Sequence, residues 1–341
     1  MIPALAVAQE VRDRGHHAVF VGTRSGMEAK LVPAEGFDLR WIEIGGLQGA
    51  GWKKRSKTVF QIPGSVLASG RILKELAAEV VFSMGGYVAA PVMMAAILRK
   101  TPMVVMEPNA MPGLTSRKMG RWVTKALLSF PEAEPFFRRG TTELTGRPVR
   151  HEFFDISPKP RGDQLTVLIT GGSQGSRTLN QATQQAWPKL KAAGIRVIHQ
   201  AGAGPAPEIA AAFAGSGVEG RVVAFIDDMV AAFAEADLVV SRSGGTVAEL
   251  AAAGKPSILV PYPFAADDHQ LRNAQAFERV GASRLVLDKE LTGDRLYKEI
   301  AAIAKSPETL ETMAKAAKSL ARPGAAKRAA EVLEEVAGKR K

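Results

Sequence analysis

A length of 341 residues suits two domains, each able to bury a core, and 46% hydrophobic with 23% charged residues is ordinary for a globular protein. The chain has no cysteine, which excludes disulfides, thiolate metal sites and a cysteine nucleophile. Its formal net charge of +11 favours an anionic partner, such as a phosphate-rich ligand, nucleic acid or an acidic membrane face.

The first part of the chain alternates helical and strand-like segments. Residues 3–14 carry a proline near the first turn and apolar residues at helical spacing, which predicts a helix. The valine- and isoleucine-rich runs AVFVG, LRWIEI, EVVFSM and PMVVME then predict parallel strands covered on both faces. Residues 80–98 are uncharged and long enough to cross a bilayer, but Gly85, Gly86 and Pro91 interrupt them. A strand, a glycine turn and a helix explain this run without a membrane.

Residues 145–164 predict a domain boundary, because they are rich in proline, glycine and charge. Strand-like runs and helical stretches continue to alternate beyond them, which predicts an α/β fold with right-handed crossovers. We therefore divide the chain into an N-terminal domain, 1–148, and a C-terminal domain, 149–322. Residues 323–341 hold a last amphipathic helix that could pack on either domain, including back on the N-terminal one.

The sequence TVLITGGSQGSRTLN is a strand that ends in glycines and opens a helix. Gly171, Gly172 and Gly175 let the backbone approach a ligand, and Ser173 offers a hydroxyl, which suits a diphosphate at a helix N-terminus. The spacing is not that of an NAD fingerprint or a P-loop. A tight strand-to-helix turn is the alternative for this loop taken alone.

A second loop of this kind, SRSGGTVAE, follows a later strand. Residues 244–246 would offer N–H groups to anionic oxygens, and Glu249 could accept from ribose hydroxyls or only complement the helix dipole. His269 and Gln270, in the loop that follows Pro263, could bind sugar hydroxyls or cap the next helix. Two such loops in one half of the chain predict a pocket for a nucleotide-diphosphate sugar.

Six stretches, in order along essentially the whole chain, resemble the MurG family: FSMGGYVAAP, EPNAMPGLTSR, GRPVR, GGSQGSRTLN, FIDDM and SRSGGTVAELAAAGKPSILVPYPFAADDHQLRNA. The resemblance implies a GT-B fold, two Rossmann-like, doubly wound parallel-sheet domains facing a cleft. It implies an inverting glycosyltransferase that moves N-acetylglucosamine (GlcNAc) from UDP-GlcNAc to the MurNAc 4-hydroxyl of undecaprenyl-pyrophosphoryl-MurNAc-pentapeptide. This step converts lipid I to lipid II in peptidoglycan synthesis, at the cytoplasmic face of the inner membrane.

The resemblance also assigns site residues. The UDP-GlcNAc residues that it implies are Asn109, Arg150, Ser173, Ile226, Gly244, Gly245, Thr246, Glu249 and Gln270. Gly85, Gly86 and Tyr87 are implied at the acceptor pyrophosphate. No D-x-D motif occurs, so helix N-termini and Arg150 are expected to neutralise the leaving UDP without a metal, and no cofactor is expected.

A basic and apolar stretch predicts peripheral binding to an anionic membrane. Trp52, Lys53, Lys54, Arg55 and Lys57 stand beside apolar residues, as at a lipid interface. A solvated loop with a buried helix face is the alternative. Nucleic acid is not expected as a partner, because no nucleic-acid-binding signature accompanies the charge.

Three departures from the family pattern bear on activity. Met106 stands where many members carry histidine, and SRSGGTVAE is one residue shorter than the usual form. Members also begin with a strand and a G-G-T-G-G-H loop, whose histidine is the proposed general base, before the helix that opens this chain. Met1 is therefore expected to be an internal methionine, and this form is expected to fold poorly and to transfer GlcNAc weakly or not at all, while still binding UDP through its C-terminal half.

The general base consequently stays unassigned, with Glu107 as the candidate within the chain. A UDP-GlcNAc epimerase and a catalytically inactive nucleotide-sugar binder are the alternative functions.

Overall fold

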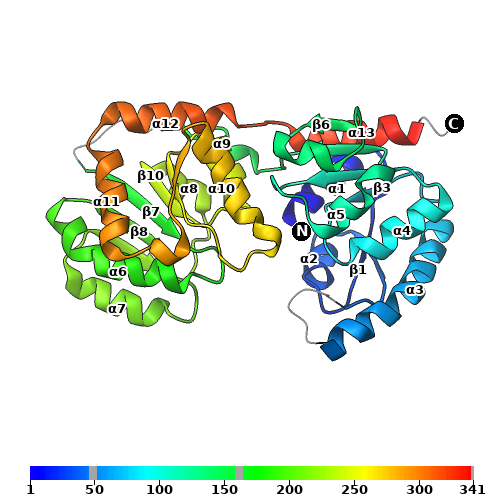
Figure 1. Ribbon diagram of the computed structural model, residues 1–341, viewed down its shortest axis with the longest axis horizontal. Helices are drawn as coiled ribbons and strands as arrows, with labels where there is room; N and C mark the ends of the chain where they lie inside the picture. The colour runs from blue at the N-terminus through cyan, green and yellow to red at the C-terminus, as the bar shows by residue number, and fades with distance from the viewer. Residues whose placement is uncertain (46–51, 158–163, 339–341) are drawn as a thin grey trace. The chain divides into compact units, whose positions relative to one another are not determined.

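The computed structural model describes residues 1–45, 52–157 and 164–338, with the backbone alone for residues 52–60. The chain forms two compact units: unit 1 is Met1–Pro148 with Gly324–Lys341, and unit 2 is Val149–Pro323. Each unit combines parallel strands with covering helices (Figure 1).

Unit 2 contains a six-stranded parallel sheet in the order β12-β11-β10-β7-β8-β9. Because β7 pairs with both β8 and β10, the strand order reverses between β7 and β10, and ligands of open α/β sheets bind at such a switch point. The strands are β7 (Thr166–Thr170), β8 (Arg196–Gln200), β9 (Gly220–Val223), β10 (Leu238–Ser241), β11 (Ser257–Leu259) and β12 (Ser283–Leu285).

The helices of unit 2 bury one apolar face against this sheet. Leu179, Ala182, Ala186 and Leu190 recur at helical spacing on α6 and join the core, whereas β7 is buried along its whole length. The helices are α6 (Arg177–Ala192), α7 (Ala206–Ser216), α8 (Met229–Glu235), α9 (Thr246–Ala253), α10 (His269–Arg279), α11 (Gly293–Ala304) and α12 (Pro307–Ser319). Short 3-10 turns are η3 (His151–Phe153), η4 (Ala266–Asp268) and η5 (Asp288–Glu290).

Unit 1 contains two separate parallel sheets, β1-β2 and β3-β4-β5-β6. The strands are β1 (Val19–Gly22), β2 (Asp38–Trp41), β3 (Val81–Ser83), β4 (Met103–Glu107), β5 (Lys125–Leu128) and β6 (Thr142–Leu144). The covering helices are α1 (Ile2–Asp13), α2 (Glu28–Ala34), α3 (Trp52–Glu75), α4 (Ala89–Arg99), α5 (Leu114–Met119) and α13 (Ala325–Gly338). The short turns are η1 (Gly120–Trp122) and η2 (Pro131–Phe136).

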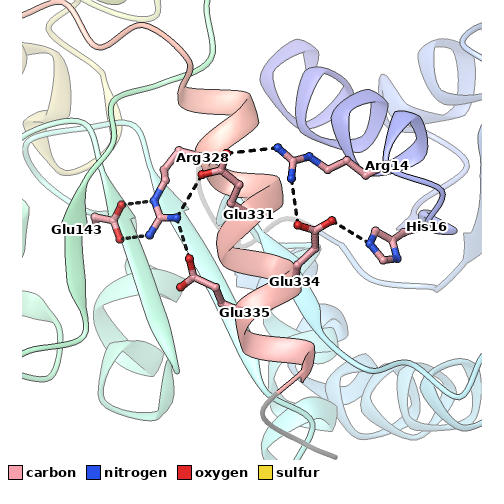
Figure 2. Close-up of polar contacts among 7 residues, drawn as sticks. All are labelled: Arg14, His16, Glu143, Arg328, Glu331, Glu334 and Glu335. Carbon is pink, nitrogen blue, oxygen red and sulfur yellow. Dashed lines mark hydrogen bonds and ion pairs between the residues drawn. The ribbon is translucent and has the colours of Figure 1, made fainter.

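The last helix, α13, packs on unit 1, where Val332 and Val336 join a buried cluster with β4 and α1. Met106, which is expected at the family's histidine position, is fully buried in this cluster. Figure 2 shows that Arg328 points from α13 toward Glu143 of β6, while Glu334 points toward α1. Polar contacts with β6 and with the end of α1, on either side of the apolar contact made by Val332 and Val336, therefore hold α13 on unit 1.

The uncharged run at residues 80–98 forms β3, a glycine turn and α4. Among the helices of the described residues, none is both long enough and apolar enough to cross a membrane. The helix α3 begins at Trp52, and the side chains of the predicted membrane residues Trp52, Lys53, Lys54, Arg55 and Lys57 lie outside the described part of the chain.

Candidate active site

A pocket of about 520 Å³ lies at the switch point of the unit 2 sheet. Its walls come from the turns after β7, β10 and β11 and from the starts of α6, α9 and α10. The lining residues are Gly171, Gly172, Gly175, Ser176, Arg177, Thr178, Arg242, Gly244, Gly245, Thr246, Tyr262, Pro263, Phe264, Gln270 and Asp288. Both glycine-rich loops that the sequence predicts therefore meet here.

The first loop needs its glycines for close backbone packing. A Cβ atom on Gly171 would overlap the amide of Ser176, and one on Gly175, where φ is +73°, would overlap the carbonyl of Ala201. Ser176 caps α6, because its hydroxyl accepts a hydrogen bond from the Leu179 amide at 3.3 Å. The predicted Ser173 is exposed on the same loop and is not among the pocket-lining residues.

Arg242, which the sequence analysis does not single out, joins four segments around the pocket. Its guanidinium donates to Asp288 Oδ1 at 2.5 Å and to the Ser176 hydroxyl at 2.6 Å. It also donates to the carbonyls of Val260, at 3.1 Å, and Pro261, at 3.2 Å. One side chain thus joins the start of α6, the end of β10, the end of β11 and η5. Its place directly before SGG, in the quoted loop, is the signal that could have found it.

The second loop brings Gly244, Gly245 and Thr246 into the pocket wall at the start of α9. Gln270, at the start of α10, faces Gly244, and its Oε1 accepts a hydrogen bond from the Tyr262 amide at 3.0 Å. The neighbouring His269 contacts the Ala266 carbonyl through Nδ1 at 2.8 Å. Of the two candidates in this loop, only Gln270 is among the residues that line the pocket.

The other residues predicted for the donor lie outside these walls. Glu249 is half-buried on α9, and Arg150 is exposed, with its guanidinium 5.2 Å from the ring centre of Phe153. The Ile226 amide donates to the side chain of Gln200 at 3.0 Å, and Gln200 in turn donates to the Gly172 carbonyl at 2.8 Å. Gln200, another residue absent from the sequence-based set, thereby ties Ile226 to the first glycine loop.

In unit 1, the predicted acceptor and sugar residues follow two paired strands. Gly85 and Gly86 follow β3 with φ of +76° and +87°, and Tyr87 beside them is exposed. Glu107 ends β4, and Asn109 comes two residues later. Because β3 and β4 are neighbouring parallel strands, their carboxyl ends share one edge of the sheet.

The pocket suits an anionic ligand. N–H groups at the starts of α6 and α9 carry the positive ends of the helix dipoles, and the positive charge of the half-buried Arg242 is paired with Asp288. Polar groups around the anion site, such as Gln270, can hydrogen-bond hydroxyls. The arrangement can therefore bind a diphosphate together with an attached sugar.

Comparison with known proteins also indicates a glycosyltransferase, and the matches cover most of the chain. Residues 1–128 match the glycosyltransferase family 28 N-terminal domain, and residues 166–329 match the C-terminal domain of that family. A UDP-N-acetylglucosamine–N-acetylmuramyl-(pentapeptide) pyrophosphoryl-undecaprenol N-acetylglucosamine transferase from Solibacter usitatus is 58% identical, over 99% of this chain and 93% of its own length. The chain belongs to the MurG family.

Further relatives agree with membership in the MurG family. A transferase of the same name from Myxococcus xanthus is 39% identical, over 97% of this chain and 88% of its own length. The crystal structure of Acinetobacter baumannii MurG matches with a TM-score of 0.83 and 29% identity, over 98% of this chain and 95% of that one. A UDP-N-acetylglucosamine 2-epimerase, with a TM-score of 0.67 and 12% identity, shares the fold alone. These matches confirm the predicted α/β class, the GT-B fold and the assignment as a hexosyltransferase.

Proposed function

We propose that this protein transfers GlcNAc from UDP-GlcNAc to the MurNAc 4-hydroxyl of undecaprenyl-pyrophosphoryl-MurNAc-pentapeptide. The observation that carries the proposal is the pocket at the switch point of unit 2, built from two glycine-rich loops in a chain of the MurG family. The acceptor hydroxyl gives its proton to a general base and attacks the anomeric carbon of GlcNAc, the bond to the UDP oxygen breaks with its electron pair left on UDP, and the configuration at that carbon inverts.

The donor occupies unit 2 in this proposal. Residues 244–246 and the first glycine loop bind the diphosphate, because their N–H groups and helix dipoles favour negative charge. Gln270 hydrogen-bonds the GlcNAc hydroxyls, and Glu249 accepts from the ribose. Asn109 contacts the donor sugar, and the backbone of Ile226 pairs with uracil. Arg150 and Ser173 contact the nucleotide and its phosphates.

The leaving group gains negative charge as the glycosidic bond breaks. Preorganised donors aimed at developing charge are a major source of rate acceleration. The starts of α6 and α9 supply such donors at the pocket, and Arg150 adds a cation in the proposed mechanism. Gly85, Gly86 and Tyr87 of unit 1 bind the acceptor pyrophosphate.

The lipid-linked acceptor places the reaction at a membrane, so we propose peripheral binding to the anionic cytoplasmic face. The described part of α3 exposes Leu67, Arg71 and Lys74 at helical spacing, and α4, which packs on α3, exposes Leu98 next to Arg99. Leu67 is 66% and Leu98 is 74% exposed. Apolar groups among basic ones favour an anionic lipid interface. Leu67, Arg71 and Lys74 belong to the same helix, α3, as the predicted cluster at residues 52–57.

An assay with UDP-GlcNAc and a soluble lipid I analogue tests the proposal. The expected product is the GlcNAc–MurNAc disaccharide on the acceptor, detected by mass spectrometry. An epimerised sugar nucleotide would instead support the epimerase alternative. UDP-GlcNAc binding without either product would support an inactive nucleotide-sugar binder.

A further inference from the structure

Glu107 is a buried carboxyl group at the carboxyl end of β4, in the unit that is proposed to receive the acceptor. The residue is 2% exposed, and burial raises the pKa of its carboxyl above the usual value for glutamate. Its Oε1 accepts hydrogen bonds from both the backbone amide and the side-chain amide of Asn109, each at 3.2 Å. One oxygen therefore fixes the backbone and the side-chain rotamer of a residue that is proposed to contact the donor sugar.

The segment after Asn109 is bound to the glycine turn that follows β3. Thr115, in the first turn of α5, donates through its hydroxyl to the Gly86 carbonyl at 3.0 Å. Ser116 is fully buried beneath Gly85, where an added Cβ atom would lie 3.2 Å from the Ser116 hydroxyl. The turn proposed for the acceptor pyrophosphate thus rests on the helix that begins a few residues after Asn109.

A general base must reach the proton that it removes, directly or through one water. The Glu107 side chain points away from solvent, and one of its oxygens is occupied by Asn109. This geometry suits a residue that holds its neighbours in place better than one that takes a proton from the acceptor hydroxyl.

We propose that Glu107 is a positioning residue: it holds Asn109 in a fixed rotamer and, through the segment that leads into α5, steadies the Gly85–Gly86 turn. This inference rests on the proposed function, because it deepens the roles given there to Asn109 and the turn. Small errors in the placement of reacting groups are costly to the rate, so the effect reaches the reaction although Glu107 itself touches no substrate.

The substitution Glu107→Gln separates positioning from base catalysis. Glutamine keeps the oxygen that accepts from Asn109 but cannot act as a base at neutral pH. A positioning role predicts that Glu107→Gln stays within about fivefold of wild type with an unchanged pH profile, whereas Glu107→Leu loses about 10- to 100-fold in kcat/KM for the donor. A base would instead cost about 10²- to 10⁴-fold in both variants and would remove one limb of the pH profile, which would overturn the proposal.

Amide hydrogen exchange at Asn109 provides a readout that does not depend on activity. Protection is expected to persist in Glu107→Gln and to be lost in Glu107→Leu, because only the former keeps an acceptor for this amide. Equal loss in both variants would contradict the proposal. If wild type shows no transfer but this exchange pattern holds, the proposed function fails while the positioning geometry stands. Glu35→Gln and Glu35→Leu, at an exposed residue of the same unit, are the matched controls.

Discussion

Arg242 illustrates how much of the donor site depends on one side chain. Its guanidinium contacts Asp288 of η5 and Ser176 at the start of α6, and the side chain is only 13% exposed. Lysine keeps the charge but cannot reproduce a fork of several hydrogen bonds. We expect Arg242→Lys to weaken UDP-GlcNAc binding by about 1.5–3 kcal/mol, since hydrogen bonds to charged groups have this magnitude. Isothermal titration calorimetry measures the change.

The matched control for Arg242 is Arg295→Lys on α11, a residue that pairs with Glu299 and is not among those lining the pocket. It is expected to bind UDP-GlcNAc like wild type. Wild-type affinity in a folded Arg242→Lys protein would show that the donor site does not need this network.

His199 makes the stability of unit 2 depend on pH. It is fully buried on β8, and burial lowers its pKa from 6.5 to about 4. Between pH 4 and pH 6.5 the unfolded chain binds a proton at His199 that the folded chain does not. The contribution of His199 to the free energy of unfolding is therefore complete above pH 6.5 and is lost as the pH falls toward 4. The free energy of unfolding is expected to fall by about 3 kcal/mol from pH 7 to pH 4 because of His199.

Urea unfolding of wild type and His199→Gln between pH 7 and pH 4 isolates this effect, because the carboxyl groups that also titrate there are common to both proteins. Hydrogen exchange in β8 reports on the unit concerned. Parallel pH curves for the two proteins would rule out the contribution of His199.

Among the helices and strands, the sequence predicts those whose own residues show the apolar pattern of a strand or a helix. The run TVLIT, three apolar residues between threonines, is β7, and the helix predicted over residues 3–14 is α1, which spans Ile2–Asp13. The strands β5, β6 and β12 are missed. They are three or four residues long, with sequences KALL, TEL and SRL, and their pairing with neighbouring strands defines them.

The candidate site likewise combines features that are visible in the local sequence with features that arise only on folding. Glycine-rich loops after strands are visible in the sequence, and Gly244 to Thr246 do line the pocket. Arg242 stands directly before the second glycine loop, but its contacts could not be derived from local pattern, because its partners Ser176 and Asp288 lie 66 and 46 residues away in the chain. Glu107 and Asn109 are two residues apart, but burial, which decides what Glu107 can do, is a property of the folded unit.

The helix α13 offers a test of how polar contacts fix an element. Arg328 binds Glu143 through two hydrogen bonds, one of them at 3.1 Å, and lies within 2.8 Å of Glu335 (Figure 2). The Arg328 guanidinium lowers the pKa of Glu143. For this half-buried bidentate pair we expect a coupling free energy near the upper end of the range for surface ion pairs, about 1 kcal/mol.

A double-mutant cycle with Arg328→Gln and Glu143→Gln measures this coupling from the free energy of unfolding. The pair Lys315–Glu311, both members of which are largely exposed on α12, is the control and is expected to give about 0.3–0.5 kcal/mol. Coupling for Arg328–Glu143 that does not exceed the control would mean that this pair does not help to hold α13 on unit 1.

For the whole molecule, the net charge of +11 and the exposed leucines of α3 and α4 predict binding to anionic vesicles. Binding is expected to fall with salt, because exposed charges are screened over about 8–10 Å at physiological ionic strength. Replacing Lys53, Lys54, Arg55 and Lys57 by Gln is expected to remove most of it, since each basic residue contributes about 1 kcal/mol.

Cosedimentation with phosphatidylserine-containing vesicles measures this binding. Leu67→Ser with Leu98→Ser is expected to weaken it further, whereas Val280→Ser, at an exposed apolar residue of unit 2, serves as the control and leaves it unchanged. Unchanged cosedimentation of the four-fold Gln variant would place the membrane surface elsewhere.

An inverting transfer of GlcNAc to a lipid-linked MurNAc fixes the anomeric configuration of the product, which can be measured. Purified protein is incubated with UDP-GlcNAc and a lipid I analogue, and the product is analysed by mass spectrometry and proton NMR. We expect a β-linked GlcNAc on the MurNAc 4-hydroxyl, formed in a one-to-one ratio with released UDP, at any rate above that of heat-inactivated protein. An α-linked product, or UDP release without a disaccharide, would contradict the proposed transfer.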